Sequence, residues 1–595
     1  MKSRKLMMFL LAIVMLLVTA CGPGEKKSIK SGEEGVDASK FAIETTNNAP
    51  AVKDAVLKVA LVKDSPLVGI FYTNIGQGDG YDGDLISTFF NNQIFDTDEN
   101  FEITDTGLST LNVDIPNKKA TIKIKDGVKW SDGQPLVADD IIYTFEVIAN
   151  KDYTGVRFDD ESLKVVGVKE YHEGKADHIS GLKKIDDKTV EVSFTELGQG
   201  IYTIGNGLIG SVLPKHYLKD IPIKDLEKSE KVRSKVLTLG AYTIVSNVQG
   251  ESLELKANPY YFKGKPKIEK VTVEVVNSNT IVSALKAGKY DLALRIPTDL
   301  YKTYSNLDNL ELLGRQELYY SYMGFKVGHF DKAKGENIMD PNAKMADKNL
   351  RQALAYGLDV DQMTKAFYYG LRERATMSVP PAFKKYYSKD IKGYPYDPEK
   401  AKKLLDEAGY KDVDGDGLRE DNKGNKLVFN FAFQGGNNYD QALADTFIKS
   451  WKEVGLDVKL LDNKLMGKKE WDQRVLGDDP EIDLFLGAGH HGSDPSRQEL
   501  FGRQSQFNYF RYTSDKIDEA FKEQRSDEMF DDNKLKEAYN KFDDLITDEL
   551  PFFGLSWDTE ITYVNKRVKH FNVEDFTKGR LSVENLELTK EAPEK

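Results

Sequence analysis

The chain has 595 residues, of which 40% are hydrophobic and 30% are charged, a composition typical of globular proteins. Its length exceeds what one hydrophobic core usually holds, so two or more large lobes are expected. The net charge of −13 argues against binding to nucleic acid, because no broad cationic surface is available for phosphates. The only cysteine is Cys21, which excludes a disulfide within the chain.

The N-terminal sequence MKSRKLMMFLLAIVMLLVTAC predicts a signal peptide. Lys2, Arg4 and Lys5 form a positive segment, and the apolar segment that follows is short for a membrane span. It ends in Val-Thr-Ala-Cys, which resembles the lipobox of bacterial lipoproteins. That resemblance implies that residues 1–20 are a lipoprotein signal peptide and that acyl chains on Cys21 anchor the protein to a membrane.

Residues 21–55 predict a flexible tether after the anchor. The segment is rich in Gly, Ser, Lys and Glu and has few large apolar side chains. Such a composition buries too little surface to offset the entropy of ordering the chain.

The next distinctive stretch is KIKDGVKWSDGQPLVADDIIYTFEVI, residues 123–148. Alternating residues predict a strand, the Ser-Asp-Gly-Gln-Pro segment predicts a turn, and helical spacing of apolar residues follows. Asp139 is placed where an N-cap is expected. The turn and the cap account for the polar residues, and no histidine in the segment can activate Ser131 or Asp132. The stretch is therefore predicted to be scaffold.

Segments from this stretch onward resemble, in order, those of family 5 solute-binding proteins of ABC importers, which bind oligopeptides, dipeptides or nickel. The resemblance covers roughly residues 56–575, and within the family the chain most resembles an oligopeptide-binding protein. The segments that carry it include GVKWSDGQPLVADDIIYTF at 127–145, LPKH at 213–216, LKANPYYFKGKPKIEKVTVEVV at 255–276, LRQALAYGLD at 350–359, YPYDPEKAKKLLDEAGYKDVDGDGLRE at 394–420, GSDP at 492–495 and NKRVKHF at 565–571.

The resemblance implies an α/β fold of two lobes that close on a ligand, as in a periplasmic-binding-protein clamshell. The first lobe is expected to be discontinuous, comprising residues 56–296 and 551–590. It is expected to carry an extra subdomain at about 86–195. The second lobe is expected at 297–550.

The resemblance also implies a peptide site that pairs with the ligand backbone and holds its cationic amine with an aspartate. In the loop GAGHHGSDPSRQELF, Asp494 is the candidate, and a helix cap ahead of Pro495 is the alternative role. Gly489, His490 and His491 open the same loop. Further candidate ligand contacts are Asn91 and Asn92 in TFFNNQIFD, with Tyr320, Tyr322, Asn437, Tyr439 and Trp557.

Dipeptide binders of this family place an arginine in the segment that corresponds to FQGGNNYDQALAD, residues 433–445. This segment has no arginine. We therefore expect longer peptides without a fixed anchor for their C-terminal carboxylate.

Two groups of residues raise the question of a metal. Asp412, Asp414, Asp416 and Glu420 are spaced as in a calcium loop, although Lys423 stands where an EF-hand has its bidentate glutamate. An acidic turn is the simpler interpretation. His490 and His491 could bind nickel or haem, but adjacent side chains on an extended segment point in opposite directions. No cofactor is therefore expected, with calcium kept open.

An enzyme is not expected, because no HExxH or GxSxG motif occurs in the sequence. We expect a monomer, lipid-anchored outside the cytoplasmic membrane, that delivers oligopeptides to an ABC permease and its ATPase subunits. The alternatives are the same fold binding nickel, haem or another small solute, or a peptide-signal receptor or adhesin without transport.

Overall fold

The computed structural model describes residues 35–595 apart from 77–79, 156, 160 and 578–582. The predicted signal peptide, Cys21 and the first part of the predicted tether lie outside the described residues. In the described ranges, none of the helices combines the length and the apolar composition needed to cross a bilayer.

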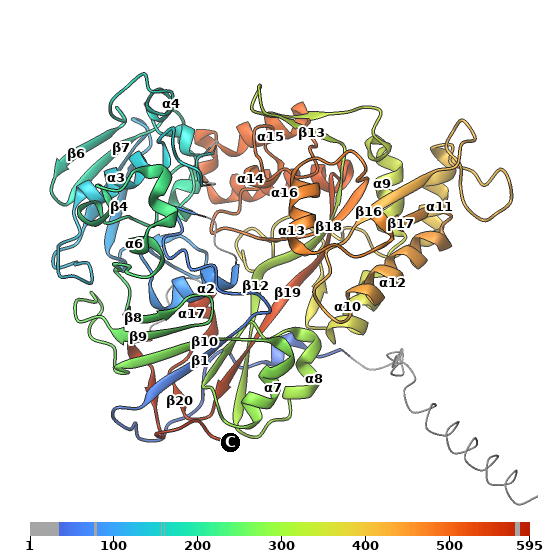
Figure 1. Ribbon diagram of the computed structural model, residues 1–595. Helices are drawn as coiled ribbons and strands as arrows, with labels where there is room; N and C mark the ends of the chain where they lie inside the picture. Colours follow the sequence, from blue (N-terminus) through green and yellow to red (C-terminus); the bar gives the residue numbers. More distant parts are fainter. Residues whose placement is uncertain (1–34, 77–79, 156, 160, 578–582) are drawn as a thin grey trace, which may run out of the picture. The chain divides into compact units, whose positions relative to one another are not determined.

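The unit formed by Val36–Lys595 is built on a mixed sheet of 11 strands (Figure 1). Within the described residues, the strand order is β17-β16-β18-β12-β19-β11-β1-β10-β9-β8, and β15 pairs with β19. Parallel pairs join β1 to β10 and β11, and β16 to β17 and β18. The strand bounds are β1 Val56–Val62, β8 Tyr242–Val248, β9 Ser252–Ala257, β10 Lys270–Val276, β11 Leu292–Leu294, β12 Leu310–Phe325, β15 Arg372–Arg374, β16 Val428–Ala432, β17 Asp457–Leu460, β18 Leu484–His490 and β19 Phe552–Asn565.

The long antiparallel strands β12 and β19 run side by side through the middle of this unit and connect its two lobes (Figure 1). Their register shifts between Gln316 and Tyr320 and again beyond Ser321. On one side of these shifts, Leu310 and Tyr563 belong to a core shared with β1. On the other side, the same strands contribute to the core of the second lobe.

The expected lobe boundaries therefore need correction. Tyr304, expected in the second lobe, packs in the core of the first lobe. Phe552 and Trp557, expected in the first lobe, pack in the core of the second. The chain changes lobes inside β12 and β19, because both strands continue across the junction without a break, so no turn or proline marks the crossing in the sequence.

The first lobe holds a separate four-stranded sheet in the order β4-β5-β7-β6. Its core runs from Ile94 to Val212 and includes Leu239, so it extends past the predicted end at 195. Elements of the first lobe are β2 Asp96–Thr97, β3 Ile103–Thr104, β4 Ser109–Asp114, β5 Lys119–Ile124, β6 Leu182–Asp186, β7 Thr189–Ser193, β20 Val568–Lys569, β21 Glu587–Leu588, α2 Gly80–Phe89, α3 Ala138–Ile148, α4 Val168–His172, α5 Lys215–Leu218, α6 Glu230–Arg233, α7 Ser278–Lys286, α8 Tyr301–Tyr304 and α17 Val573–Thr577.

The stretch 123–148 contains the end of β5, a turn and the helix α3, but the cap of this helix differs from the prediction. Asp139 lies inside the first helical turn and pairs with Lys184. The carboxylate that holds the start of the helix is that of Asp140, which accepts the Val137 backbone N–H and the Trp130 indole N–H, both at 3.1 Å. The buried Trp130 therefore fixes the turn to the helix. The prediction that the whole stretch is scaffold needs correction, because Phe145 and Ile148 of α3 line the cavity described below.

In the second lobe, helices pack on the strands β16, β17 and β18 (Figure 1). Phe431 of β16 packs edge-to-face on Trp451 of α12, with ring centres 5.5 Å apart. The remaining elements of this lobe are α9 Lys348–Tyr356, α10 Val360–Tyr368, α11 Pro398–Glu407, α12 Asp440–Glu453, α13 Lys468–Trp471, α14 Gln498–Phe501, α15 Asp515–Gln524, α16 Asp532–Glu549, β13 Gly328–Asp331 and β14 Glu336–Met339.

Residues 36–55, expected as part of the flexible tether, instead form backbone hydrogen bonds with other segments of the folded unit. The backbone N–H of Val36 donates to Tyr369, that of Thr45 to Phe571 and that of Val52 to Leu588. Ala42 also bridges Leu313 of β12, and Phe41 packs edge-to-face on Tyr301. The prediction was wrong here because a few apolar residues and backbone hydrogen bonds are enough to order this segment along neighbouring strands. Composition alone does not reveal that such strands are available.

Candidate functional site

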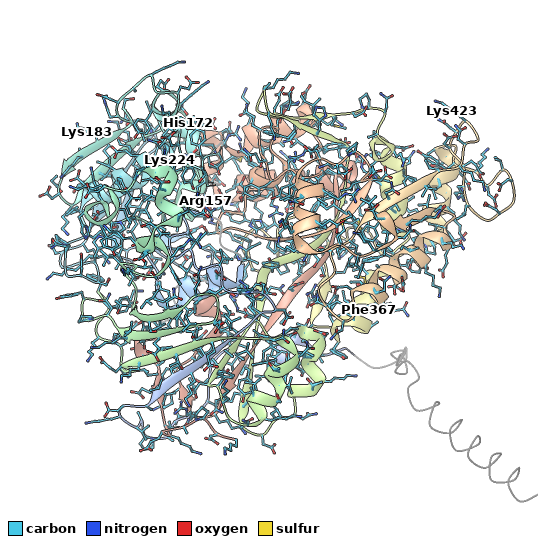
Figure 2. The ribbon with its side chains drawn as sticks, viewed as in Figure 1. Arg157, His172, Lys183, Lys224, Phe367 and Lys423 are labelled. Atoms are coloured by element: carbon cyan, nitrogen blue, oxygen red, sulfur yellow. The ribbon has the colours of Figure 1, made fainter. Side chains whose placement is uncertain are left out.

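A cavity of about 590 Å³ lies between the two lobes. Its lining comes from the first lobe at 204–211 and around 157–168, and from the second lobe at 488–509 and the middle of β12. Arg157, labelled in Figure 2, lies on the side of the first lobe that faces the second. The volume is in the range of natural ligand sites.

Direct contacts join the lobes beside this cavity. The Ser493 hydroxyl donates to the Thr203 carbonyl at 2.6 Å. The Gln199 amide donates to Asp532 at 2.7 Å. Lys385 of the second lobe pairs with Glu102 of the first lobe at 2.5 Å. The lobes are therefore in contact around the cavity, as in the closed form of a two-lobed binding protein.

Asp494 lies in the loop after β18 and lines the cavity. Its Oδ1 accepts the Ser496 backbone N–H at 2.9 Å, so the residue closes a local turn rather than capping a longer helix. The carboxylate packs on the backbone of Gly200 and Gly205, where a Cβ atom would collide with Oδ2. Burial, with the repulsion of Glu161, raises the pKa of Asp494 to about 6. The group is therefore largely ionised at neutral pH and sits in a poorly solvated place.

His490 and His491 both line the cavity but face different neighbours. The His490 ring lies edge-on to Tyr319, and the His491 ring lies 4.7 Å from that of Phe383. Burial lowers the pKa of His490 to about 4 and the pKa of His491 well below its ordinary value, so both rings are neutral at pH 7. In the part of the chain that the structure describes, neither histidine belongs to a group with metal-ligand geometry.

Gly489, Tyr320 and Tyr322 also line the cavity, and their contact with a ligand stays a prediction. The two tyrosine rings lie 5.7 Å apart and are largely buried. A Cβ atom on Gly489 would stand 2.7 Å from the Tyr320 hydroxyl, so glycine is needed for this close approach. These residues form a rigid aromatic wall at the β12–β18 pair.

Asn91 and Asn92 are not among the residues that line the cavity. Asn92 is buried, and its Oδ1 accepts the Leu239 backbone N–H at 2.8 Å and the Thr238 hydroxyl at 3.2 Å. Asn91 accepts the Gln93 backbone N–H at 2.9 Å. The neighbouring Gln93, rather than either asparagine, lines the cavity. The two amides hold the segment in place, which corrects their predicted position.

Asn437, Tyr439 and Trp557 also lie outside the cavity lining. The Asn437 backbone N–H donates to Asp440 at 2.7 Å, at the start of α12. Tyr439 packs edge-to-face on Tyr368. Trp557 is buried beside Tyr320, with ring centres 5.8 Å apart. Core packing and helix capping explain these three residues.

Sequence reasoning missed several residues that line the cavity. The signal for Arg497 was present, because it follows Asp494 by three residues in the same turn-rich loop. The residues from the first lobe had no such signal, because only folding brings them to the loop. The missed residues include Asn74, Gln93, Arg157, Tyr319, Arg497 and Tyr509.

The acidic loop of Asp412, Asp414, Asp416 and Glu420 is the candidate calcium site from the sequence, and none of these residues lines the cavity. Oxygen atoms of Asp412, Asp414 and Glu420 lie within 4.8 Å of one another, and Asp416 is not part of that group. The Lys426 ammonium pairs with Asp414 at 3.0 Å and with Asp416 at 2.7 Å. The loop therefore already has a cation against two of its carboxylates, and calcium binding stays a prediction.

Comparison with known proteins agrees with the fold and the cavity. Residues 108–508 match the family model described as "Bacterial extracellular solute-binding proteins, family 5 Middle". The oligopeptide-binding protein OppA of Lactococcus lactis subsp. lactis is 33% identical over 569 residues, covering 93% of each chain. The oligopeptide-binding protein AppA of Bacillus subtilis (strain 168) is 29% identical over 442 residues, 72% of this chain and 74% of that protein.

A solved structure of lactococcal OppA, complexed with an endogenous peptide in the closed conformation, superposes with a TM-score of 0.83. It is 31% identical and covers 89% of this chain and 99% of its own. The chain belongs to family 5 of the bacterial extracellular solute-binding proteins. The predicted α/β clamshell is confirmed, and the chain is a binding protein rather than an enzyme.

Proposed function

We propose that this protein captures oligopeptides outside the cytoplasmic membrane and delivers them to an ABC permease with its ATPase subunits for import. The observation that supports the proposal is the cavity between the touching lobes, whose lining includes Asp494. The likeness to OppA over 93% of both chains supports a peptide as the ligand.

In this proposal Asp494 holds the peptide's α-amine. Its carboxylate is poorly solvated, and an ammonium partner restores the stabilisation that burial removes. Tyr320 and Tyr322 give a wall of apolar and polar character against which varied side chains pack. Backbone pairing between the ligand and strands of both lobes remains part of the proposal, since main-chain groups are common to all peptides.

The proposal places the protein on a lipid anchor at Cys21, on the outer face of the cytoplasmic membrane, as a monomer. The sequence before the cysteine supports this. Mass spectrometry of the N-terminal peptide of the mature protein is expected to find Cys21 as the first residue, carrying acyl chains. A mature protein with an unmodified Cys21 would contradict the anchor.

Native mass spectrometry of the full-length protein purified in detergent tests the ligand class. Denaturing release is expected to yield a heterogeneous set of peptides with a narrow range of lengths. A single non-peptide mass, a haem or a nickel ion would overturn the peptide proposal and leave the fold unchanged. Import is tested separately by deleting the permease and measuring uptake of the peptides that were released.

A further inference from the structure

Arg497 is a buried cation at the wall of the cavity. Its side chain lines the cavity, and the residue is only 5% exposed. The guanidinium carbon lies 4.9 Å from the centre of the Tyr320 ring, which supports one face of the group. Among the described residues, Nε and Nη2 of this guanidinium have no hydrogen-bond partner.

The nearby acids form no ion pair with this guanidinium. Asp543 is buried, and its Oδ1 accepts the Ser378 backbone N–H at 2.7 Å. Its Oδ2 has no hydrogen-bond partner among the described residues, and burial raises the pKa of this carboxyl against the opposing effect of the Arg497 charge, which lowers it. Asp494 accepts the Ser496 backbone N–H. No carboxylate of the described residues forms an ion pair with Arg497, whereas the buried Arg351 donates to several backbone carbonyls. An unpaired buried charge is costly to keep, so a site that retains one is built for a partner of opposite charge.

We propose that Arg497 receives a carboxylate of the bound ligand, next to the place where Asp494 receives the amine. This inference rests on the proposed function that the cavity binds peptides. A guanidinium presents parallel N–H donors that match the two oxygens of a carboxylate. The ligand class is therefore a peptide that carries a carboxylate close to its amino end.

Two sources supply such a carboxylate. An acidic side chain among the first residues of a longer peptide is one, and the C-terminus of a short peptide is the other. The expectation from the sequence was that the C-terminal carboxylate of the peptide has no fixed anchor, because residues 433–445 lack an arginine. The structure instead places an arginine at the cavity from the Asp494 loop, three residues further along the chain.

Matched peptides test this proposal with the full-length protein in detergent, freed of endogenous ligand by unfolding and refolding. One arm compares pentapeptide amides that carry Glu or Gln at each of the first three positions. The other arm compares alanine tripeptides with a free or an amidated C-terminus. Titration calorimetry is expected to show a preference for the acid member of one arm of about tenfold to a hundredfold.

Arg497→Met is expected to reduce that preference to about threefold or less, because the acid members lose more affinity than the neutral members do. Arg497→Lys should keep part of the preference, because the charge remains and the fork is lost. Arg503→Met is the matched control, since Arg503 pairs with Asp515 and Asp518 and does not line the cavity. That variant should retain the full preference.

Thermal unfolding separates ligand binding from a structural role for the arginine. Without ligand, Arg497→Met should be at least as stable as the wild type, because it removes a buried unpaired charge. Equal wild-type affinities for both members of every pair would overturn the proposal, as would an equal loss of acidic and neutral peptides in Arg497→Met together with a lower Tm. If the wild type binds none of the peptides, the proposed function itself fails and this inference falls with it.

Discussion

Two regions of this protein bury arginine and acid side chains. In one region the arginine and the acid are paired with each other, and in the other they are not. At the base of the first lobe, Arg567 and Asp291 are fully buried and form two short hydrogen bonds to each other. Asp291 also accepts the Lys58 backbone N–H, and Arg567 donates to two carbonyls. In the cavity, Arg497 keeps unpartnered donors beside a wall of tyrosines.

The contrast shows which charges serve the fold and which are kept for a ligand. A buried pair with its hydrogen bonds completed fixes strands relative to each other but leaves nothing for a solute. A buried group with unused donors destabilises the free protein and becomes favourable only when a partner arrives. A second buried pair that serves the fold joins the strands β12 and β19, where Arg315 pairs with Glu560. Burial would raise the pKa of Glu560, but Arg315 and Arg295 outweigh it and lower the pKa to about 2.

The largest expected effect comes from breaking the completed pair. Asp291→Asn leaves Arg567 buried without its counter-charge, which should lower the free energy of unfolding by about 3–5 kcal/mol. Urea denaturation followed by circular dichroism measures this change.

The matched control is Glu230→Gln, which removes the exposed pair with Lys235 and should leave the denaturation midpoint unchanged. If Asp291→Asn unfolds at the wild-type midpoint, the buried pair contributes no specific stabilisation and the contrast between the two regions disappears.

The next largest expected effect concerns Asp494, which lines the cavity. Asp494→Asn keeps the size of the side chain and removes its charge, so it should weaken binding of peptides with a free amine by about tenfold to a hundredfold. Amino-acetylated forms of the same peptides should bind the variant and the wild type equally. Titration calorimetry with both peptide forms gives the comparison.

Asp440→Asn serves as the control for this variant, because Asp440 is an acid of the second lobe that caps its own loop outside the cavity. Its free-amine preference should equal that of the wild type. An unchanged preference in Asp494→Asn would show that another group holds the amine.

The sequence predicted much of the fold but fewer of the residues that line the cavity. Ordered motifs along most of the chain resemble those of family 5 solute-binding proteins, and that resemblance implied the clamshell. The lobe boundaries could not be placed, because β12 and β19 cross between lobes inside uninterrupted strands. Residues 36–55 were expected to be flexible because composition does not report the sheet edge to which they bind.

For the cavity, the segment 489–494 was predicted because its residues are contiguous, and the structure brings them together at one wall. Asn92 was misplaced for the opposite reason. Its amide points into the lobe, toward Leu239, and a sequence does not say on which side of a loop an amide faces. Arg157 and Gln93 reach the cavity only through contacts between distant segments.

Asn92 offers a test of that structural role. Asn92→Ala leaves the buried Leu239 N–H without its acceptor, which should cost about 1–3 kcal/mol of unfolding free energy. Peptide affinity should stay within about threefold of the wild type once the protein is folded. A loss of affinity greater than this at unchanged stability would return Asn92 to the binding site.

The smallest expected effect is a dependence on pH that runs in opposite directions for binding and for stability. With a pKa of about 6, Asp494 is mostly ionised at pH 7 and mostly protonated at pH 5.5, so affinity for a free-amine peptide should fall about fourfold between them. The folded pKa is raised above the ordinary value of 3.8, so the folded state binds more protons than the unfolded state between these values. The contribution of Asp494 to stability therefore increases as the pH falls.

Comparison with Asp494→Asn isolates both trends from the other titrating groups near the cavity, which include Glu161, Glu499 and Lys164. At pH 7 the variant should have the higher Tm, because it lacks an ionised carboxylate in a poorly solvated place. The difference in Tm should shrink toward pH 5, and the fourfold change in affinity should vanish in the variant. If both proteins lose affinity equally on acidification, a group other than Asp494 governs the cavity's response to pH.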